Sequence, residues 1–205
     1  MKSRLNKPDT VKQLVILAGG RGSRLKSETK QFPKPLVQLF DGSCMLGLLL
    51  DKYIKLFPKI LILAGYRAEQ IQDFVSQKYV NSKGNIKVLV EPTPMGTSGA
   101  LIYHKDYLDE HFMLVNGDTW LDINPVEINI FRENVIGKVF LTLIDEADRY
   151  GSVSMDSNDF IIAFNEKSAK VNYQKNFINT GHYIFQKQIQ INTALPFHEI
   201  KGLQE

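Results

Sequence analysis

The chain has 205 residues, 43% hydrophobic and 23% charged, with a formal net charge of +3 at pH 7. This length supports one α/β domain with a substantial core. The small net charge, with basic residues spread along the chain, argues against a nucleic-acid partner. A single cysteine, Cys44, excludes an internal disulfide and favours a reducing compartment.

The N-terminal residues 1–12 are polar, and no apolar stretch of signal-peptide length follows them. The first apolar run, residues 13–17, is far shorter than the roughly 20 residues that span a bilayer. We therefore expect residues 1–12 to be an extension and residues 13–205 to form a single domain. The protein is predicted to be cytoplasmic, without a membrane partner.

The first half of the chain alternates strand and helix patterns. Short apolar runs predict buried strands at residues 13–17, 59–64, 86–90 and 112–115. Helical spacing of apolar residues predicts helices at residues 45–56, which Pro58 closes, at 68–79 and at about 98–107. Such alternation indicates βαβ units, so we expect an α/β fold with a Rossmann-like, mostly parallel sheet flanked by helices.

The second half has a different pattern. Strand-like segments with turn residues between them occupy residues 139–144, 152–155, 160–164 and 177–185. We expect these segments to extend the sheet, which then becomes mixed.

A glycine-rich turn follows the first predicted strand. Residues 17–25 read LAGGRGSRL, and Lys34-Pro35 follows. Glycines let backbone N–H groups approach an anion without an intervening Cβ, and Arg24 and Lys34 add positive charge. This pattern is typical of a polyphosphate site. A dinucleotide fingerprint would need a third glycine in place of Leu25, so Asp41 is a weak candidate for a ribose-binding acid. No Gly-Lys-Ser or Gly-Lys-Thr of a Walker loop occurs.

A series of motifs in order resembles the sugar-phosphate nucleotidyltransferase family. The family signature L-A-G-G-x-G-[S/T]-R-L with a K-P pair matches at every position. EPTPMGTSGA at residues 91–100 resembles the nucleobase loop, and NGDT at residues 116–119 resembles the metal-carboxylate motif. Tyr150-Gly151, FNEK at residues 164–167 and NTG at residues 179–181 follow in the family's order. The resemblance covers residues 13 to about 185 and implies the nucleotide-diphospho-sugar transferase type of fold.

The resemblance implies that a nucleoside triphosphate and a sugar 1-phosphate combine, with release of pyrophosphate and with Mg²⁺ as cofactor. It allows a homo-oligomer. The implied catalytic residues are Arg24, Lys34 and Asp118, of which Asp118 binds the metal. The implied nucleotide-binding residues are Leu17, Ala18, Gly19, Gly20, Gly22, Ser23, Glu91, Gly96 and Thr97. The implied sugar-phosphate-binding residues, on the lobe formed by the later strands, are Asn116, Gly151, Glu166, Lys167, Asn179 and Thr180.

Within the family, the motifs resemble most closely those of heptose 1-phosphate guanylyltransferases of lipopolysaccharide or capsule biosynthesis, which favours GTP and a heptose 1-phosphate. A cytidylyl- or uridylyltransferase for another sugar 1-phosphate or for phosphocholine is the alternative. Glu91 could accept hydrogen bonds from the N1–H and N2 amino groups of guanine or from the N4 amino group of cytosine, which disfavours uracil.

Members of this family usually continue further, with a second metal-binding aspartate near a Gly-Thr-Pro turn. This chain ends at Glu205 before such a motif, so we expect the family's C-terminal part to be lacking. The second hypothesis is therefore a non-catalytic protein that binds a nucleotide sugar.

Overall fold

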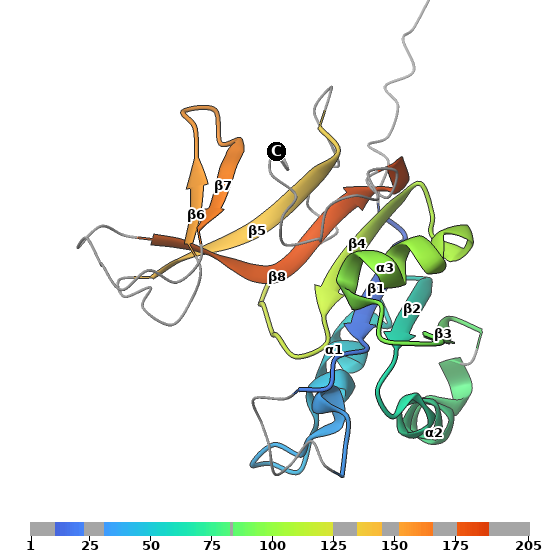
Figure 1. Cartoon of the computed structure of the whole chain (residues 1–205). Helices are drawn as coiled ribbons and strands as arrows, with labels where there is room; N and C mark the ends of the chain where they lie inside the picture. Colours follow the sequence, from blue (N-terminus) through green and yellow to red (C-terminus); the bar gives the residue numbers. More distant parts are fainter. Residues whose placement is uncertain are drawn as a thin grey trace, which may run out of the picture.

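The computed structural model describes residues 11–22, 31–82, 84–124, 135–144, 152–165 and 176–188. The parallel half of a mixed sheet lies between helices on both of its faces, in three layers, and the later strands extend beyond these helices (Figure 1). The α/β class and the mostly parallel core of the sheet, both predicted from sequence, are confirmed.

The strands are β1 Gln13–Ala18, β2 Lys59–Ala64, β3 Ile86–Val90, β4 His111–Asn116, β5 Gly137–Ile144, β6 Ser152–Met155, β7 Ile161–Asn165 and β8 Asn176–Gln186. The α-helices are α1 Met45–Tyr53, α2 Ala68–Lys78 and α3 Gly96–Tyr103. Short 3₁₀ helices are η2 Lys34–Leu36, η3 Val80–Ser82 and η4 Lys105–Tyr107. Among the described residues, no helix has both the length and the apolar character needed to cross a bilayer.

The sheet order within the described residues is β3-β2-β1-β4-β8-β6-β7, and β5 also pairs with β8. The first four strands are parallel, because a helix between each strand and the next returns the chain to the same end. Helices α1 and α2 cover one face through residues such as Leu49 and Ile71. Helix α3 covers the other face through Ala100 and Leu101. Burial on both faces explains why β1, β2 and β4 are continuous apolar runs. The prediction that residues 86–90 form a buried strand is wrong in part, because β3 ends the sheet order of the described residues and its Lys87 and Val90 are exposed.

Two predicted helices end differently from the sequence pattern. The helix predicted at residues 45–56 ends at Tyr53, whose carbonyl accepts the N–H groups of both Leu56 and Phe57 at 2.9 and 3.0 Å. Pro58 disfavours helical backbone at Phe57, which turns inward and is buried. The helix predicted at about residues 98–107 begins at Gly96 and breaks at the buried His104, after which η4 follows.

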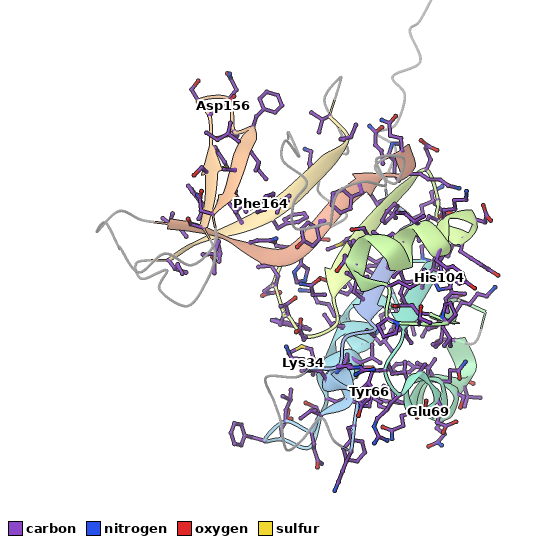
Figure 2. All side chains as sticks on the ribbon, in the orientation of Figure 1. Lys34, Tyr66, Glu69, His104, Asp156 and Phe164 are labelled. Carbon is purple, nitrogen blue, oxygen red and sulfur yellow. The ribbon has the colours of Figure 1, made fainter. Side chains whose placement is uncertain are left out.

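Strand β8 joins the parallel half of the sheet to the later strands (Figure 1). Residues 182–186 pair with β4 and residues 177–178 pair with β6, both antiparallel, while β5 pairs along most of β8. The β6–β7 hairpin extends from this region, with Asp156 at its tip and Phe164 nearer its base (Figure 2). The Asp156 carboxylate accepts the N–H groups of Asn158 and Phe160 at 2.8 and 2.9 Å, as the predicted turn requires.

Candidate active site

Three chain segments meet beyond the carboxyl ends of the parallel strands. The N–H of Gly117, after β4, donates to the carbonyl of Leu17 in β1 at 2.8 Å. The N–H of Glu91, after β3, donates to the carbonyl of Ala64 in β2 at 2.8 Å. The segments after β1, β3 and β4 are therefore held side by side, where α/β sheets commonly bind ligands.

These segments enclose a cavity of about 520 Å³. Every predicted nucleotide-binding residue that the structure describes lines this cavity, together with Lys34, Asn116 and Asp118. Its full lining is Leu17, Ala18, Gly19, Gly20, Arg21, Gly22, Lys34, Pro35, Glu91, Pro94, Gly96, Thr97, Ala100, Asn116 and Asp118. Ser23 and Arg24 lie outside the described residues.

Sequence reasoning did not assign a role to four of the lining residues: Arg21, Pro35, Pro94 and Ala100. All four lie inside the motifs that were identified, Arg21 in the variable position of the glycine-rich turn. Their position in a motif was the available signal. The weak candidate Asp41 is not among the lining residues, and its carboxylate instead accepts the N–H and hydroxyl of Ser43 at 3.0 and 2.6 Å.

The glycines of the turn serve different purposes. A Cβ on Gly20 would have no atom within 4 Å, so this residue leaves open space in the cavity. Gly22 has φ +62°, a left-handed conformation that favours glycine. A Cβ on Gly19 would lie 2.3 Å from Oε1 of Glu91, so the missing side chain lets the Glu91 carboxylate lie against the glycine-rich turn.

Glu91 stabilises its own loop and faces the glycine-rich turn. Its Oε2 accepts the N–H of Met95 at 3.1 Å, and its Oε1 lies over the Cα of Gly19. Partial burial raises the pKa of the Glu91 carboxyl, although the hydrogen bond from Met95 acts in the opposite direction. The side chain thus carries an acceptor on a wall of the cavity.

Lys34 and Asp118 form an ion pair in the cavity, although they lie 84 positions apart in the chain. Figure 2 labels Lys34, which begins η2 between Pro33 and the buried Pro35. Gly117 lets the segment that carries Asp118 approach β1 and η2 closely. A Cβ on Gly117 would lie 2.6 Å from the Leu17 carbonyl oxygen and 3.2 Å from Cγ of Pro35. The two side chains remain 38% and 33% exposed, so both charges are accessible to a ligand.

The carboxylates that line the cavity are those of Asp118 and Glu91. Among the described residues, no three His, Cys, Asp or Glu side chains gather as a metal-binding group. Within this cavity, the described residues therefore offer a cation two carboxylates at most, of which Asp118 lies beside Lys34, rather than a complete set of protein ligands.

Asn116 contacts the NTG segment of β8. A Cβ on Gly181, which has φ +74°, would lie 2.5 Å from Nδ2 of Asn116. In this segment Asn179 donates to the hydroxyl of Tyr183 at 2.7 Å, and the Thr180 hydroxyl donates to the carbonyl of Phe140 at 2.7 Å.

Neither Asn179 nor Thr180 is among the cavity-lining residues, and their contact with a sugar phosphate stays a prediction. Gly151, Glu166 and Lys167 lie outside the described residues.

A mixed sheet whose parallel strands carry a glycine-rich turn, the Glu91 loop and a lysine–aspartate pair around one cavity is typical of α/β proteins with a ligand site at the carboxyl ends of the strands. The chain belongs to the Nucleotidyl transferase family, which matches residues 13–201. The sequence-based assignment to the sugar-phosphate nucleotidyltransferases, and thus to a class of enzymes, is confirmed.

Three proteins are similar to this chain over most of its length. The D-glycero-alpha-D-manno-heptose 1-phosphate guanylyltransferase of Campylobacter jejuni is 30% identical over 89% of this chain and 80% of its own length. The bifunctional protein GlmU of Methanocaldococcus jannaschii is 30% identical over 85% of this chain, which spans only 40% of that protein. The solved structure of HddC from Yersinia pseudotuberculosis complexed with GMP-PN has a TM-score of 0.74 and 28% identity, covering 91% of this chain and 81% of that one.

Proposed function

We propose that this protein transfers a guanylyl group from GTP to a heptose 1-phosphate, giving GDP-heptose and pyrophosphate. The observation that carries the proposal is the single cavity that unites the glycine-rich turn, the Glu91 loop and the Lys34–Asp118 pair. The guanylyltransferase of Campylobacter jejuni and the HddC structure with GMP-PN, both similar over most of the chain, support the choice of base and sugar.

The base would contact Glu91. Because Oε2 already accepts the Met95 N–H, Oε1 is the atom that we expect to accept hydrogen bonds from the base. Guanine offers N1–H and the N2 amino group side by side, whereas cytosine offers only its N4 amino group to this acceptor. An amino group is a suitable donor to this carboxylate and uracil has none, so Glu91 disfavours uracil. The preference for guanine over cytosine comes from the guanylyltransferase relative and the GMP-PN complex.

The reaction needs charge neutralisation and alignment more than proton transfer. An oxygen of the sugar 1-phosphate attacks the α-phosphorus of GTP, the new O–P bond forms, and the bond to the β-phosphate oxygen breaks to release pyrophosphate. Backbone N–H groups of the glycine-rich turn would hold the triphosphate. Lys34 would leave Asp118 and contact the reacting phosphates, where its charge lowers their mutual repulsion.

Magnesium fits the residues present. Mg²⁺ is commonly bound by one or two carboxylates together with substrate phosphates, and Asp118 supplies an accessible carboxylate beside the expected phosphate position. Bound there, the ion would neutralise negative charge on the triphosphate. Asp118 would hold it, while Gly117 keeps the aspartate close to β1.

A panel of ligands tests the proposal. GTP, CTP, UTP and ATP, each with Mg²⁺, are compared by thermal shift, and pyrophosphate release is then measured with heptose 1-phosphate, glucose 1-phosphate and phosphocholine. We expect GTP to stabilise most, by about 2.7 kcal/mol at a hundredfold excess over its Kd, and release to require the heptose. Stronger stabilisation by CTP would favour a cytidylyltransferase. GTP binding without release from any acceptor would favour the non-catalytic relative.

A further inference from the structure

Lys52 lies outside the motifs, yet it contacts the chain just after Asp118. Its ammonium, at the last turn of α1, donates to the carbonyl of Leu121 at 2.6 Å. The same nitrogen lies 4.6 Å from the ring centroid of Trp120, 5.5 Å from that of Tyr53 and 3.2 Å from a carboxylate oxygen of Asp122. The side chain is only 14% exposed, so the charge is largely withdrawn from water.

These contacts differ in strength. The Asp122 side chain is 94% exposed, and an ion pair with such a partner contributes little. The bond to the Leu121 carbonyl is charge-assisted and partly buried, which makes it stronger than a neutral hydrogen bond. The cation over the Trp120 ring adds a second attraction. Lys52 therefore acts mainly on the backbone at Leu121 and the ring at Trp120.

Asp118 lies between this contact and a second anchor. On its N-terminal side, the Gly117 N–H donates to the Leu17 carbonyl of β1 at 2.8 Å. On its C-terminal side, Leu121 is held by Lys52. Helix α1 also packs against η2, which carries Lys34, so one helix supports both members of the Lys34–Asp118 pair.

We propose that Lys52 is a positioning residue for the transfer reaction: it holds residues 120–122 and thereby sets the position of Asp118 in the cavity. This inference rests on the proposed function, and it adds a residue that contacts neither substrate. Without the ammonium, the described contacts on the C-terminal side of Asp118 are the long hydrogen bonds from the N–H and hydroxyl of Thr119 to the Asn116 carbonyl, both at 3.3 Å. These are weaker than a charge-assisted bond, so the Asp118 carboxylate moves relative to Lys34 and to the phosphates.

Kinetics of Lys52→Met give the first test, with GTP, heptose 1-phosphate and Mg²⁺. We expect kcat to fall about ten- to a hundredfold, because a small displacement of a reacting group has effects of this size. The Mg²⁺ concentration for half-maximal rate should rise, while the KM for GTP stays within about twofold. Lys52→Arg should recover most of kcat, since a guanidinium can donate to the same carbonyl.

Lys78→Met is the matched control. Lys78 also combines an ion pair, with Asp51 at 3.0 Å, and a contact with aromatic rings, those of Phe74 and Tyr79, but on α2 away from Asp118. This variant should keep the parental kcat and Mg²⁺ dependence. Equal losses in the two methionine variants, or a loss of kcat that Lys52→Arg does not restore, would overturn the inference.

Fluorescence gives a test that does not depend on turnover. Trp120 is the only tryptophan of the chain, so its emission reports on this segment directly. Lys52→Met should shift the emission to longer wavelength and increase quenching by acrylamide, whereas Lys78→Met should leave both unchanged. Unchanged emission and quenching in Lys52→Met would refute the inference. Absence of turnover in the parent protein would instead count against the proposed function, and the fluorescence result would still decide the role of Lys52.

Discussion

Replacement of Gly20 by valine separates binding from folding better than a change at either neighbouring glycine. A Cβ at Gly20 would meet no atom within 4 Å, and the φ angle of Gly20 lies outside the left-handed region. At Gly19 a side chain would collide with Glu91, and at Gly22 the φ of +62° would strain any other residue. Gly20 therefore tests the cavity without disturbing the fold.

The expected magnitudes follow from this geometry. The free energy of unfolding should change by no more than about 0.5 kcal/mol, as for other substitutions that create neither a clash nor a cavity. The isopropyl group would occupy space that phosphate oxygens need to reach the backbone N–H groups. Loss of two hydrogen bonds to a charged group, at about 1.5 kcal/mol each, amounts to about 3 kcal/mol. This corresponds to a roughly hundredfold weaker Kd for GTP.

Isothermal titration calorimetry with GTP and urea unfolding measure the two quantities on the same protein. Gly84→Val is the control, because Gly84 also has no atom within 4 Å of a Cβ but lies in the turn before β3, outside the cavity lining. The control should bind GTP as the parent does. If Gly20→Val keeps the parental Kd, the glycine-rich turn is not the triphosphate site and the reasoning fails.

Four further outcomes are expected. Asp118→Asn should remove Mg²⁺-dependent turnover while weakening GTP binding much less, and unchanged turnover would show that the metal is held elsewhere. Lys34→Ala should lower kcat strongly in steady-state kinetics, because its charge stabilises the transition state more than the ground state; a change confined to the KM for GTP would contradict this role. Glu91→Gln should weaken GTP binding about tenfold or more by calorimetry. Burial raises the pKa of Glu91, so as the pH falls, GTP binding to the parent should begin to weaken at a pH above the range in which carboxyl groups usually titrate. Burial lowers the pKa of His182 below its ordinary value of 6.5. As the pH falls, His182 therefore binds a proton in the unfolded chain before it does so in the folded protein, which favours unfolding. Urea midpoints should therefore fall as the pH drops below 6.5, less steeply in His182→Phe; equal slopes would refute this.

The sequence by itself determined the parallel half of the fold and most of the residues that line the cavity. Strands that are buried on both faces are apolar without alternation, and this local property sufficed to predict β2 Lys59–Ala64 with its observed bounds. Motifs at the carboxyl ends of β1, β3 and β4 supplied the residues predicted to bind the nucleotide. Each of these residues that the structure describes lines the one cavity, since parallel strands bring their carboxyl ends to one edge of the sheet.

The tertiary structure decided where distant segments meet. Apolar periodicity records that a strand is buried, but not that β8 lies antiparallel to β4 with β6 and β5 beside it. Helix α1 ends at Tyr53 because Phe57 turns into the core, which the helical spacing of its residues did not reveal. Lys52 contacts Leu121, 69 positions away, and no sequence pattern in either segment predicts this contact. Local composition reflects burial, whereas the choice of a partner far along the chain depends on packing that forms only when the whole sheet assembles.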